Sequence, residues 1–298
     1  MKLFRKKESP GSVTLIPYGR LASRLRTIAS AIDLFAEMPE KPVEIIWFET
    51  EEFTAPFERL FTLSPRFVPP HITIREGDWR DRCINDTPAK SNLFVTAPFL
   101  FFRYDLFLSP TKCSALHADS KDFRGEIRSL CSKPGEKVLL STNLSFSPKK
   151  DSLIYRYLEP TVEVKGVRNS RMSGWGNNVV GVHLSRKGDK NSYSESPTEL
   201  FIQRMQKMIE DDPTTTFFLA TTDPNEQERL QTIFHKRVFA LRSITEPGSH
   251  EQVIEAFGEL LALSNTRKIL TTPHSKFSEV AAEMGRLATE QLSIFNLG

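Results

Sequence analysis

Four short segments rich in hydroxyl and cationic side chains each follow an apolar run that predicts a strand. The segments are 18–20 (YGR), 185–187 (SRK), 221–223 (TTD) and 272–278 (TPHSKFS). Hydroxyls, arginine and backbone N–H groups at helix starts are donors that bind a diphosphate or another anionic ligand. For any single position, helix capping is the simpler explanation, because it uses the same residue types. Ligands of open parallel sheets bind beyond the carboxyl ends of the strands, so the four segments together favour an anion-binding site.

Several familiar sequence signatures of nucleotide, hydrolase and metal sites are missing. The chain has no G-x-x-x-x-G-K-[ST] loop and no G-x-G-x-x-G after the first predicted strand. It has no G-x-S-x-G elbow and no H-E-x-x-H helix. No D-x-D pair ends a strand, and the histidines do not recur at a metal-ligand spacing, so we expect no metal site.

The composition is that of a globular chain with a small positive excess. The 298 residues include 40 Lys and Arg against 37 Asp and Glu, which gives a net charge of +3. The charged fraction of 26% and the hydrophobic fraction of 39% exclude a disordered chain. An excess this small does not imply sequence-independent nucleic-acid binding, so no nucleic-acid partner is expected.

Cysteine usage and the apolar runs indicate a cytoplasmic protein. Cys83, Cys113 and Cys131 are too few for a disulfide scaffold and lack C-x-x-C spacing, so we expect reduced thiols. The basic start over 1–11 lacks the apolar core of a signal peptide. The longest apolar run, 93–102, is about half the ~20 residues that a spanning helix needs. Membrane contact is therefore expected to be peripheral at most.

The N-terminal part starts with a strand, a helix and a second strand. Apolar residues predict a strand over 13–16, a helix over 21–35 and a strand over 43–48. This βαβ order favours a parallel sheet with a right-handed crossover. Repeated prolines break the stretch 50–157 into short pieces, and its aromatic run 94–107 is predicted to be core.

The second half alternates strands and helices with short connections. Strands are predicted over 179–184, 216–220, 238–241 and 268–272, and helices over 253–263, over 277–284 and after the capping sequences 196–199 (SPTE) and 223–226 (DPNE). The continuous apolar run 179–184 is typical of a strand buried on both faces. The order predicts a Rossmann-like domain, with a boundary near 158–160.

Four motifs, in this order, resemble those of the fucosyltransferase-like glycosyltransferases. The family includes the bacterial nodulation fucosyltransferases, the core α1,6-fucosyltransferases and the protein O-fucosyltransferases. The motifs are GRLASRLR at 19–26, GVHLSR at 181–186, FFLATTDP at 217–224, and ELLALS at 259–264 followed by TTPHSKFSEVA at 271–281. They resemble the family's G-x-L-G-N-R-L, G-V-H-I-R-R, F-F-L-A-T-D-D-P and D-L-L-x-L-S…G-S-x-x-S-x-F-S-E-x-A. The resemblance covers about 12 to 286 and is strongest over 158–286.

The resemblance implies an α/β GT-B architecture of two Rossmann-like lobes with a central cleft. Residues 1–157 would form the acceptor-side lobe, and residues 158–298 the lobe that binds the nucleotide-sugar, usually GDP-fucose. Transfer would invert the anomeric centre without a metal, onto a hydroxyl of a glycan or a glycolipid-linked acceptor. Arginines and hydroxyl or N–H donors must then neutralise the leaving diphosphate.

The resemblance also gives individual residues a role. His183 stands at the family histidine near the guanine, and Glu259 at the Asp that reads the guanine amino edge. Ser275 matches a hydroxyl that contacts the diphosphate. Arg186 is the second arginine of H-x-R-R, and Arg24 is the N-lobe arginine that faces the cleft. The expected catalytic residues are thus Arg186 and Arg24, and the expected donor-binding residues are His183, Ser185, Asp223, Glu259, Ser275, Lys276, Phe277, Ser278 and Gly19.

Three positions in the second half depart from the family pattern, and in the first motif Ala22 and Ser23 replace Gly and Asn. Ser185 occupies the first arginine of H-x-R-R, Gly188 stands where Asp is common, and Thr222 replaces the first Asp of T-D-D. Loss of one preorganised donor typically costs about 3–4 kcal/mol, a factor of about 10²–10³ in rate. Arg186 or Lys187 could compensate, although Lys lacks the bidentate fork.

Three functions therefore stay open. The first is a metal-independent fucosyltransferase, and the second is a non-catalytic relative that binds nucleotide or glycan. The third is an unrelated α/β binding or interaction protein whose strand-end residues are helix caps. No general base is assigned: Glu49, Glu51, Glu52, Asp78 and Asp81 are carboxylates for which a solvated surface position is favoured.

Overall fold

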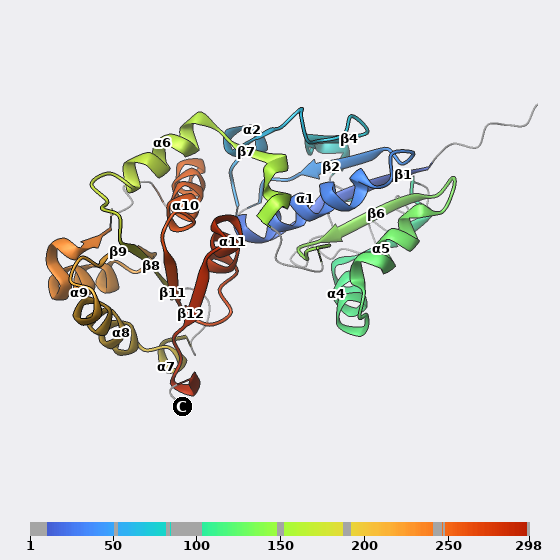
Figure 1. Cartoon of the computed structure of the whole chain (residues 1–298). Helices are drawn as coiled ribbons and strands as arrows, with labels where there is room; N and C mark the ends of the chain where they lie inside the picture. Colours follow the sequence, from blue (N-terminus) through green and yellow to red (C-terminus); the bar gives the residue numbers. More distant parts are fainter. Residues whose placement is uncertain are drawn as a thin grey trace, which may run out of the picture. The chain divides into compact units, whose positions relative to one another are not determined.

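The structure is a computed structural model, and it describes residues 11–50, 53–81, 84, 103–147, 152–186, 192–240, 246 and 248–296. The chain divides into two compact units, Met1–Glu159 and Pro160–Gly298. We refer to them as the N-terminal unit and the C-terminal unit (Figure 1).

The N-terminal unit is built on a five-stranded parallel sheet. Its elements are β1 (Ser12–Pro17), α1 (Leu21–Ala36), β2 (Val43–Trp47), α2 (Phe57–Leu60), β3 (Phe61–Leu63), β4 (Ile72–Glu76), η1 (Trp79–Asp81), β5 (Leu106–Leu108), α4 (Pro110–Asp119), α5 (Phe123–Ser132), β6 (Lys137–Thr142), η2 (Ser152–Tyr157) and β7 (Leu158–Pro160). The sheet order is β4-β2-β1-β6-β5, while β3 and β7 form a separate pair. The predicted strand–helix–strand start is confirmed as β1, α1 and β2.

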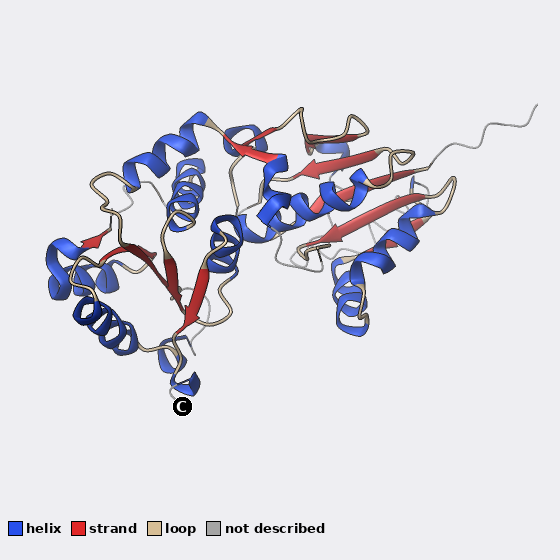
Figure 2. Cartoon of the chain, in the orientation of Figure 1, coloured by secondary structure: helices blue, strands red, loops and turns tan. Residues whose placement is uncertain are grey.

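The C-terminal unit also has a five-stranded parallel sheet, in the order β10-β9-β8-β11-β12. Its elements are α6 (Val162–Arg171), β8 (Val179–Leu184), α7 (Ser192–Glu195), α8 (Thr198–Asp211), β9 (Thr216–Thr221), α9 (Pro224–Phe234), η3 (His235–Arg237), β10 (Val238–Phe239), α10 (His250–Leu263), β11 (Lys268–Thr271), α11 (Lys276–Gly285), β12 (Ala288–Gln291) and η4 (Ile294–Asn296). Figure 2 shows this alternation of helix and strand. Numbered within the unit, the order is 3-2-1-4-5, that of a doubly wound Rossmann sheet.

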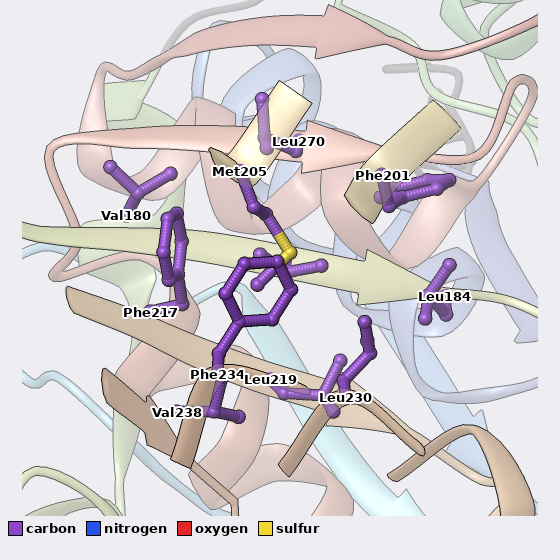
Figure 3. Packing of buried hydrophobic residues seen from close by; sticks show 11 residues of the cluster. Val180, Leu184, Phe201, Met205, Phe217, Leu219, Leu230, Phe234, Val238 and Leu270 are labelled. Atoms are coloured by element: carbon purple, nitrogen blue, oxygen red, sulfur yellow. The ribbon is translucent and has the colours of Figure 1, made fainter. Parts of the chain in front are cut away.

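The strand pleat divides the side chains of β8 between two helical layers. Val180, Val182 and Leu184 join one hydrophobic cluster with residues of α8 and α9 (Figure 3). The alternate positions, Gly181 and His183, therefore face the other layer. A Cβ on Gly181 would lie 2.5 Å from Leu263 Cδ1 of α10, so glycine permits the close approach of that helix. The expected burial of β8 on both faces is confirmed.

The two predicted helix starts have different outcomes. Asp223 caps α9 as expected, since its carboxylate accepts from the backbone N–H of Asn225 at 2.9 Å, with Pro224 following. The predicted cap by Ser196 is wrong: α8 begins at Thr198, and its N-cap residue is Pro197. The hydroxyl of Ser196 donates instead to the carbonyl of Leu292 at 2.5 Å.

The bounds of some predicted elements differ in the structure. The helix predicted over 253–263 begins earlier, at His250, because Ser249 caps it. The strand predicted over 238–241 is shorter and covers Val238–Phe239. Most of the aromatic run 94–107 lies outside the described residues.

None of the helices in the described part of the chain combines the length and the apolar character needed to cross a membrane.

Candidate functional site

The candidate site lies where β8 and β11 end side by side in the C-terminal unit. Strand order reverses between these two strands, and ligands of doubly wound sheets bind at such a switch point. The register pairs Thr271 with His183, so the segment after β11 begins beside the end of β8. The backbone N–H of Thr272 donates to the carbonyl of His183 at 3.3 Å, which fixes the path of the connection.

Three of the expected donor-binding residues come together here. Ser275 Oγ lies 3.1 Å from His183 Nδ1, and the ring of Phe277 lies 5.0 Å from the imidazole ring. Ser275 also caps α11, since its hydroxyl accepts from the backbone N–H of Ser278 at 3.5 Å. Residues from the 181–186 and 271–281 motifs thus form one cluster, which we call the β8–β11 cluster.

Burial keeps the imidazole of His183 neutral near physiological pH. Desolvation lowers the pKa of His183 to about 4. A neutral imidazole presents one donor and one acceptor nitrogen, and it adds no positive charge to the cluster. His183 can therefore orient Ser275 or a ligand, while charge neutralisation must come from other groups.

The start of α11 supplies several polar groups. Ser278 is fully buried, and its hydroxyl lies 2.6 Å from Thr271 Oγ1. Lys276 is the first residue of the helix and is exposed. A cation at a helix N-terminus is opposed by the helix dipole, which favours anions there. An anionic ligand at this terminus would interact favourably with both the dipole and the lysine.

Thr272 is the unusual member of this cluster. The residue is 2% exposed, and its hydroxyl oxygen has no hydrogen-bond partner within the described part of the chain. A buried polar group without a partner costs about 1–3 kcal/mol. The neighbouring Thr271 differs, because its hydroxyl is bonded to Ser278 and to the carbonyl of Thr272. No sequence signal separates the two threonines, and Thr272 was expected only as part of the strand-end segment.

Arg186 lies in a second cluster, formed with the starts of α8 and α9. Its Nη1 donates to the carbonyl of Ser196 and its Nη2 to Thr198 Oγ1, both at 2.8 Å. Its Nε lies 3.6 Å from Glu226 Oε1, and Thr198 donates to the same oxygen at 2.6 Å. The side chains of Arg186 and Glu226 are 2% and 9% exposed. Arg186 is therefore a buried anchor between segments that are distant in the sequence.

The other expected C-terminal residues are placed as follows. Asp223 joins the Arg186 cluster at its edge, since its carboxylate also accepts from the N–H of Glu226 at 3.4 Å. Ser185 is half-buried between His183 and Arg186. Lys187 and Gly188 lie outside the described residues.

Glu259 lies on α10 and forms an ion pair with a residue that the sequence reading missed. Arg171 Nη2 of α6 is 3.3 Å from Glu259 Oε1 and 3.8 Å from Glu255 Oε2. Burial raises the pKa of Glu259 to about 7, against the opposing effect of Arg171, and Glu255 raises it further. The spacing of Arg171 and Glu259 in sequence gave no signal for this pair.

In the N-terminal unit, Arg24 and Gly19 lie together at the β1–α1 turn. Arg24 Nε donates to the carbonyl of Gly19 at 2.7 Å, and Nη1 donates to that of Phe48 at 2.6 Å. The guanidinium lies 4.8 Å from the ring centroid of Trp47 and 4.5 Å from that of Phe53. Burial lowers the pKa of Arg24 to about 10. Gly19 has a φ of 86°, a left-handed conformation that favours glycine at this turn.

The candidate acceptor-side carboxylates differ in their surroundings. The expected solvated surface position is wrong for Asp81, which is 1% exposed because it pairs with Arg75 at 2.5 Å. Asp78 accepts from the backbone N–H of Arg80 at 2.7 Å. Glu49 is exposed, while Glu51 and Glu52 lie outside the described residues. Among the residues that the structure describes, no three His, Cys, Asp or Glu side chains gather in a way that could hold a metal ion.

Comparison by sequence finds no matching family model and no matching curated protein. Comparison by structure finds fucosyltransferases. The NodZ α-1,6-fucosyltransferase soaked with GDP-fucose has a TM-score of 0.63 and 15% identity, over 97% of this chain and 97% of that chain. A mutant of Arabidopsis thaliana FUT1 in complex with GDP has a TM-score of 0.62 and 14% identity, over 96% and 71%. POFUT1 in complex with GDP has a TM-score of 0.53 and 11% identity, over 96% and 99%.

These likenesses concern the fold, because all three identities are low. They confirm at that level the expected resemblance to the fucosyltransferase-like glycosyltransferases and the expected α/β class. The chain has the GT-B fold that these fucosyltransferases share.

Proposed function

We propose that the protein transfers a fucosyl group from GDP-fucose to a hydroxyl of a glycan or glycoconjugate. The solved structures with this fold include fucosyltransferases that hold GDP or GDP-fucose. The C-terminal unit offers a polar cluster at its switch point, which is where doubly wound sheets bind nucleotides. We therefore assign donor binding to residues 158–298 and acceptor binding to residues 1–157.

The observation that carries this proposal is the buried, unpartnered hydroxyl of Thr272 beside the N-terminus of α11. Native proteins rarely leave such a group unbonded, and those that remain need an explanation. Helix α11 has 10 residues, and the dipole at its N-terminus favours an anion. A phosphate oxygen of the donor would accept from Thr272, Ser275 and the helix N–H groups together.

In the proposed reaction, an acceptor hydroxyl attacks the sugar C1 on the face opposite the diphosphate. The C1–O bond to the diphosphate breaks with its electron pair, the acceptor oxygen releases its proton to solvent water, and the anomeric centre inverts. Negative charge grows on the diphosphate, so preorganised donors stabilise the transition state more than the ground state. We propose Arg186 and Arg24 as the cations of this reaction and assign no metal to it.

Paired threonine variants test donor binding. Thr272→Val removes the unpartnered hydroxyl and keeps the shape of the side chain. We expect the variant to be as stable as the wild type or more stable, by about 1 kcal/mol, because an unsatisfied buried group is lost. GDP affinity, measured by isothermal titration calorimetry, should fall about tenfold, as expected for one hydrogen bond to a charged group.

Thr271→Val is the matched control, since the hydroxyl of Thr271 is already bonded to Ser278 and to the carbonyl of Thr272. It should lose stability and retain GDP affinity. A wild-type chain that binds no nucleoside diphosphate at millimolar concentration would refute the proposed function. Equal GDP affinity in Thr272→Val and the wild type would show that the hydroxyl of Thr272 does not bind the donor, and would contradict the placement of the donor site at the β8–β11 cluster.

A second function, a non-catalytic nucleotide- or glycan-binding protein of the same fold, is favoured by the surroundings of Arg186. Ser185 stands where the resembled family has its first arginine, and the guanidinium of Arg186 is held by Ser196, Thr198 and Glu226. Both functions predict GDP binding. Turnover of GDP-fucose in the presence of an acceptor glycan distinguishes them.

We also propose a cytoplasmic location with at most peripheral membrane contact. Cys113 and Cys131 are free and buried, as suits a reducing compartment. Fractionation of cells that express the tagged full chain tests the location.

A further inference from the structure

A tryptophan in the N-terminal unit, Trp79, presents most of its surface to solvent. Trp79 is the first residue of η1, shortly after the end of β4, and it is 71% exposed. Among the residues that the structure describes in this unit, the next most exposed large hydrophobic side chains are Leu153 at 49% and Phe67 at 38%. Single exposed apolar residues are common on protein surfaces, so the turn that presents Trp79 matters more than its exposure.

The turn around Trp79 is held by a buried carboxylate. Asp81 is 1% exposed, and its Oδ2 accepts from Arg75 Nη1 at 2.5 Å and from the backbone N–H of Asp78 at 3.0 Å. The Oδ1 atom of Asp78 accepts in turn from the backbone N–H of Arg80 at 2.7 Å. The backbone on both sides of Trp79 is therefore fixed by side-chain hydrogen bonds. A ligand that contacts the indole would have little of this backbone left to order, and such preorganisation favours binding.

Both ends of the turn are also attached to the core of the unit. The backbone N–H of Gly77 donates to the carbonyl of Trp47 at 2.7 Å, and a Cβ on Gly77 would lie 2.3 Å from Phe48 Cε1. Glycine therefore lets the chain pass close to the ring of Phe48. At the other end, the backbone N–H of Ile84 donates to the carbonyl of Asp81 at 2.9 Å, and Ile84 is buried in the core. The exposed indole thus stands on a rigid support.

Trp79 lies at the edge of the sheet where the strands of the N-terminal unit end. Strand β4 pairs in parallel with β2, with Glu76 opposite Trp47, and β2 pairs in parallel with β1. The carboxyl ends of these three strands therefore meet at one edge, which is where open parallel sheets bind ligands. Since β4 and β1 are two strand spacings apart, the turn of Trp79 and the β1–α1 turn follow strand ends separated by about 10 Å.

The residues beside Trp79 suit a polyhydroxylated ligand better than a protein surface. Glu76, Asp78 and Arg80 are exposed, and the guanidinium of Arg80 lies 5.4 Å from the ring centroid of Trp79. Carboxylates accept from hydroxyls and a guanidinium donates to them. The core of a protein interface is depleted of charged residues, whereas a sugar presents an apolar C–H face next to its hydroxyl groups. One aromatic ring among charged side chains fits the sugar.

We propose that Trp79 is a stacking platform for one pyranose ring of an oligosaccharide, which extends along the strand-end edge toward the β1–α1 turn. The inference rests on the proposed function and names its acceptor class, because the oligosaccharide would be the acceptor. Sugars with equatorial substituents, such as β1,4-linked glucosyl units, have flat faces of axial C–H bonds that pack against an indole. The span of about 10 Å between the strand ends exceeds a single ring, so the acceptor has more than one sugar.

The test measures the binding of cellotriose and of glucose to the full chain without a donor, by isothermal titration calorimetry and tryptophan fluorescence. Cellotriose should bind at millimolar concentration, at least tenfold more tightly than glucose. Trp79→Ala should weaken cellotriose about tenfold, as expected for loss of an aromatic stacking contact. Trp79→Phe keeps a stacking ring, so it should retain most of the affinity but lose the fluorescence change. GDP affinity should be unchanged in both variants.

Phe67→Ala is the matched control. Phe67 is a partly exposed aromatic residue of the same unit, and Arg66 lies 5.4 Å from its ring, but it precedes β4 and so stands at the opposite end of that strand. This variant should bind cellotriose as the wild type does. Because both aromatic side chains are exposed, urea unfolding should show little change in any of these variants.

Several results would overturn the inference and leave the proposed function standing. These are a wild-type chain that does not bind cellotriose at millimolar concentration, equal cellotriose affinity in Trp79→Ala and the wild type, and glucose that binds as tightly as cellotriose. A wild-type dimer that Trp79→Ala dissociates, without any binding of cellotriose, would assign the tryptophan to an interface between two copies instead. Failure of the wild type to bind any nucleoside diphosphate would refute the proposed function, and it is measured separately from cellotriose binding.

Discussion

The buried pair of Arg186 and Glu226 gives the sharpest test of how the C-terminal unit works. Arg186 follows β8 by two residues, and Glu226 lies in the first turn of α9. Thr198 bonds to both side chains, so a single network joins the end of β8 to the starts of two helices. Arg186 is also the proposed catalytic cation. Its structural role and its catalytic role predict different results for one double variant.

The magnitude follows from burial. Removing one partner of a buried, hydrogen-bonded ion pair costs about 3–5 kcal/mol, because the other charge stays buried without compensation. Arg186→Met and Glu226→Leu should each lower the free energy of unfolding by an amount of this order. Replacement of both partners by apolar residues is often neutral, so the double variant should regain most of the lost stability.

The assay combines unfolding in urea with turnover of GDP-fucose. If Arg186 stabilises the leaving diphosphate, as proposed, the double variant should regain stability, while turnover stays about 10²–10³ below the wild type. The conclusion depends on comparing the recovery of stability with the loss of turnover in the double variant, because neither measurement alone separates the two roles of Arg186. Glu226→Gln, which keeps the shape of the side chain and leaves Arg186 in place, should retain turnover wherever it is folded.

One result would refute this reasoning about catalysis. If the double variant turns over GDP-fucose at the wild-type rate, Arg186 serves only to join β8 to α8 and α9. A second result would refute the reasoning about stability. If the double variant is no more stable than either single variant, the pair and its hydroxyl partner do not form the compact network that their distances indicate.

Three further predictions concern other parts of the molecule. Burial lowers the pKa of His183 to about 4, so below a pH of about 6.5 the unfolded chain binds a proton at this residue that the folded chain does not bind. The free energy of unfolding should therefore decrease as the pH falls from about 6.5 to about 4, by at most about 3 kcal/mol. Urea titrations of the wild type and of His183→Gln should show that the variant lacks this loss, with the exposed His274→Gln as the control. Gly258→Ala should destabilise the chain by about 1–3 kcal/mol, because the added Cβ clashes with Val167. Gly166→Ala, where a Cβ meets nothing within 4 Å, should stabilise α6 by about 0.5–1 kcal/mol. Equal unfolding temperatures for the two variants would contradict this expectation. Turnover of GDP-fucose should be unchanged by EDTA, and its loss on adding the chelator, with recovery on adding a divalent cation, would contradict the metal-independent reaction.

Local patterns determined much of the fold. The apolar run 179–184 could be recognised as a strand buried on both faces, because every residue of such a strand meets a hydrophobic layer. Asp223 before Pro224 predicted a helix start, because capping depends on residues that are adjacent in the chain. The strand-end segments could be found in the same way, and Ser275 and Phe277 of the segment 272–278 do meet His183 of β8 in the β8–β11 cluster.

Partner choice between distant segments was decided only by the tertiary structure. Ser196 has the local pattern of a helix cap, yet its hydroxyl bonds to Leu292, which the fold brings close from the far end of the unit. Arg186 looked like a free strand-end cation, and the fold brings Glu226 of α9 within 3.6 Å of its Nε. Local sequence could not show either contact, because each depends on how helices pack on the sheet.

The same division applies to the proposed donor site. The sequence by itself determined which residues stand at strand ends and helix starts, since period and capping are properties of neighbouring residues. Only the tertiary structure decided that Thr271 is bonded while Thr272 is not, and that Arg171 and Glu259 form a pair. The physical reason is that hydrogen bonds and charge pairs depend on distances of a few ångströms across the chain, which a one-dimensional pattern does not contain.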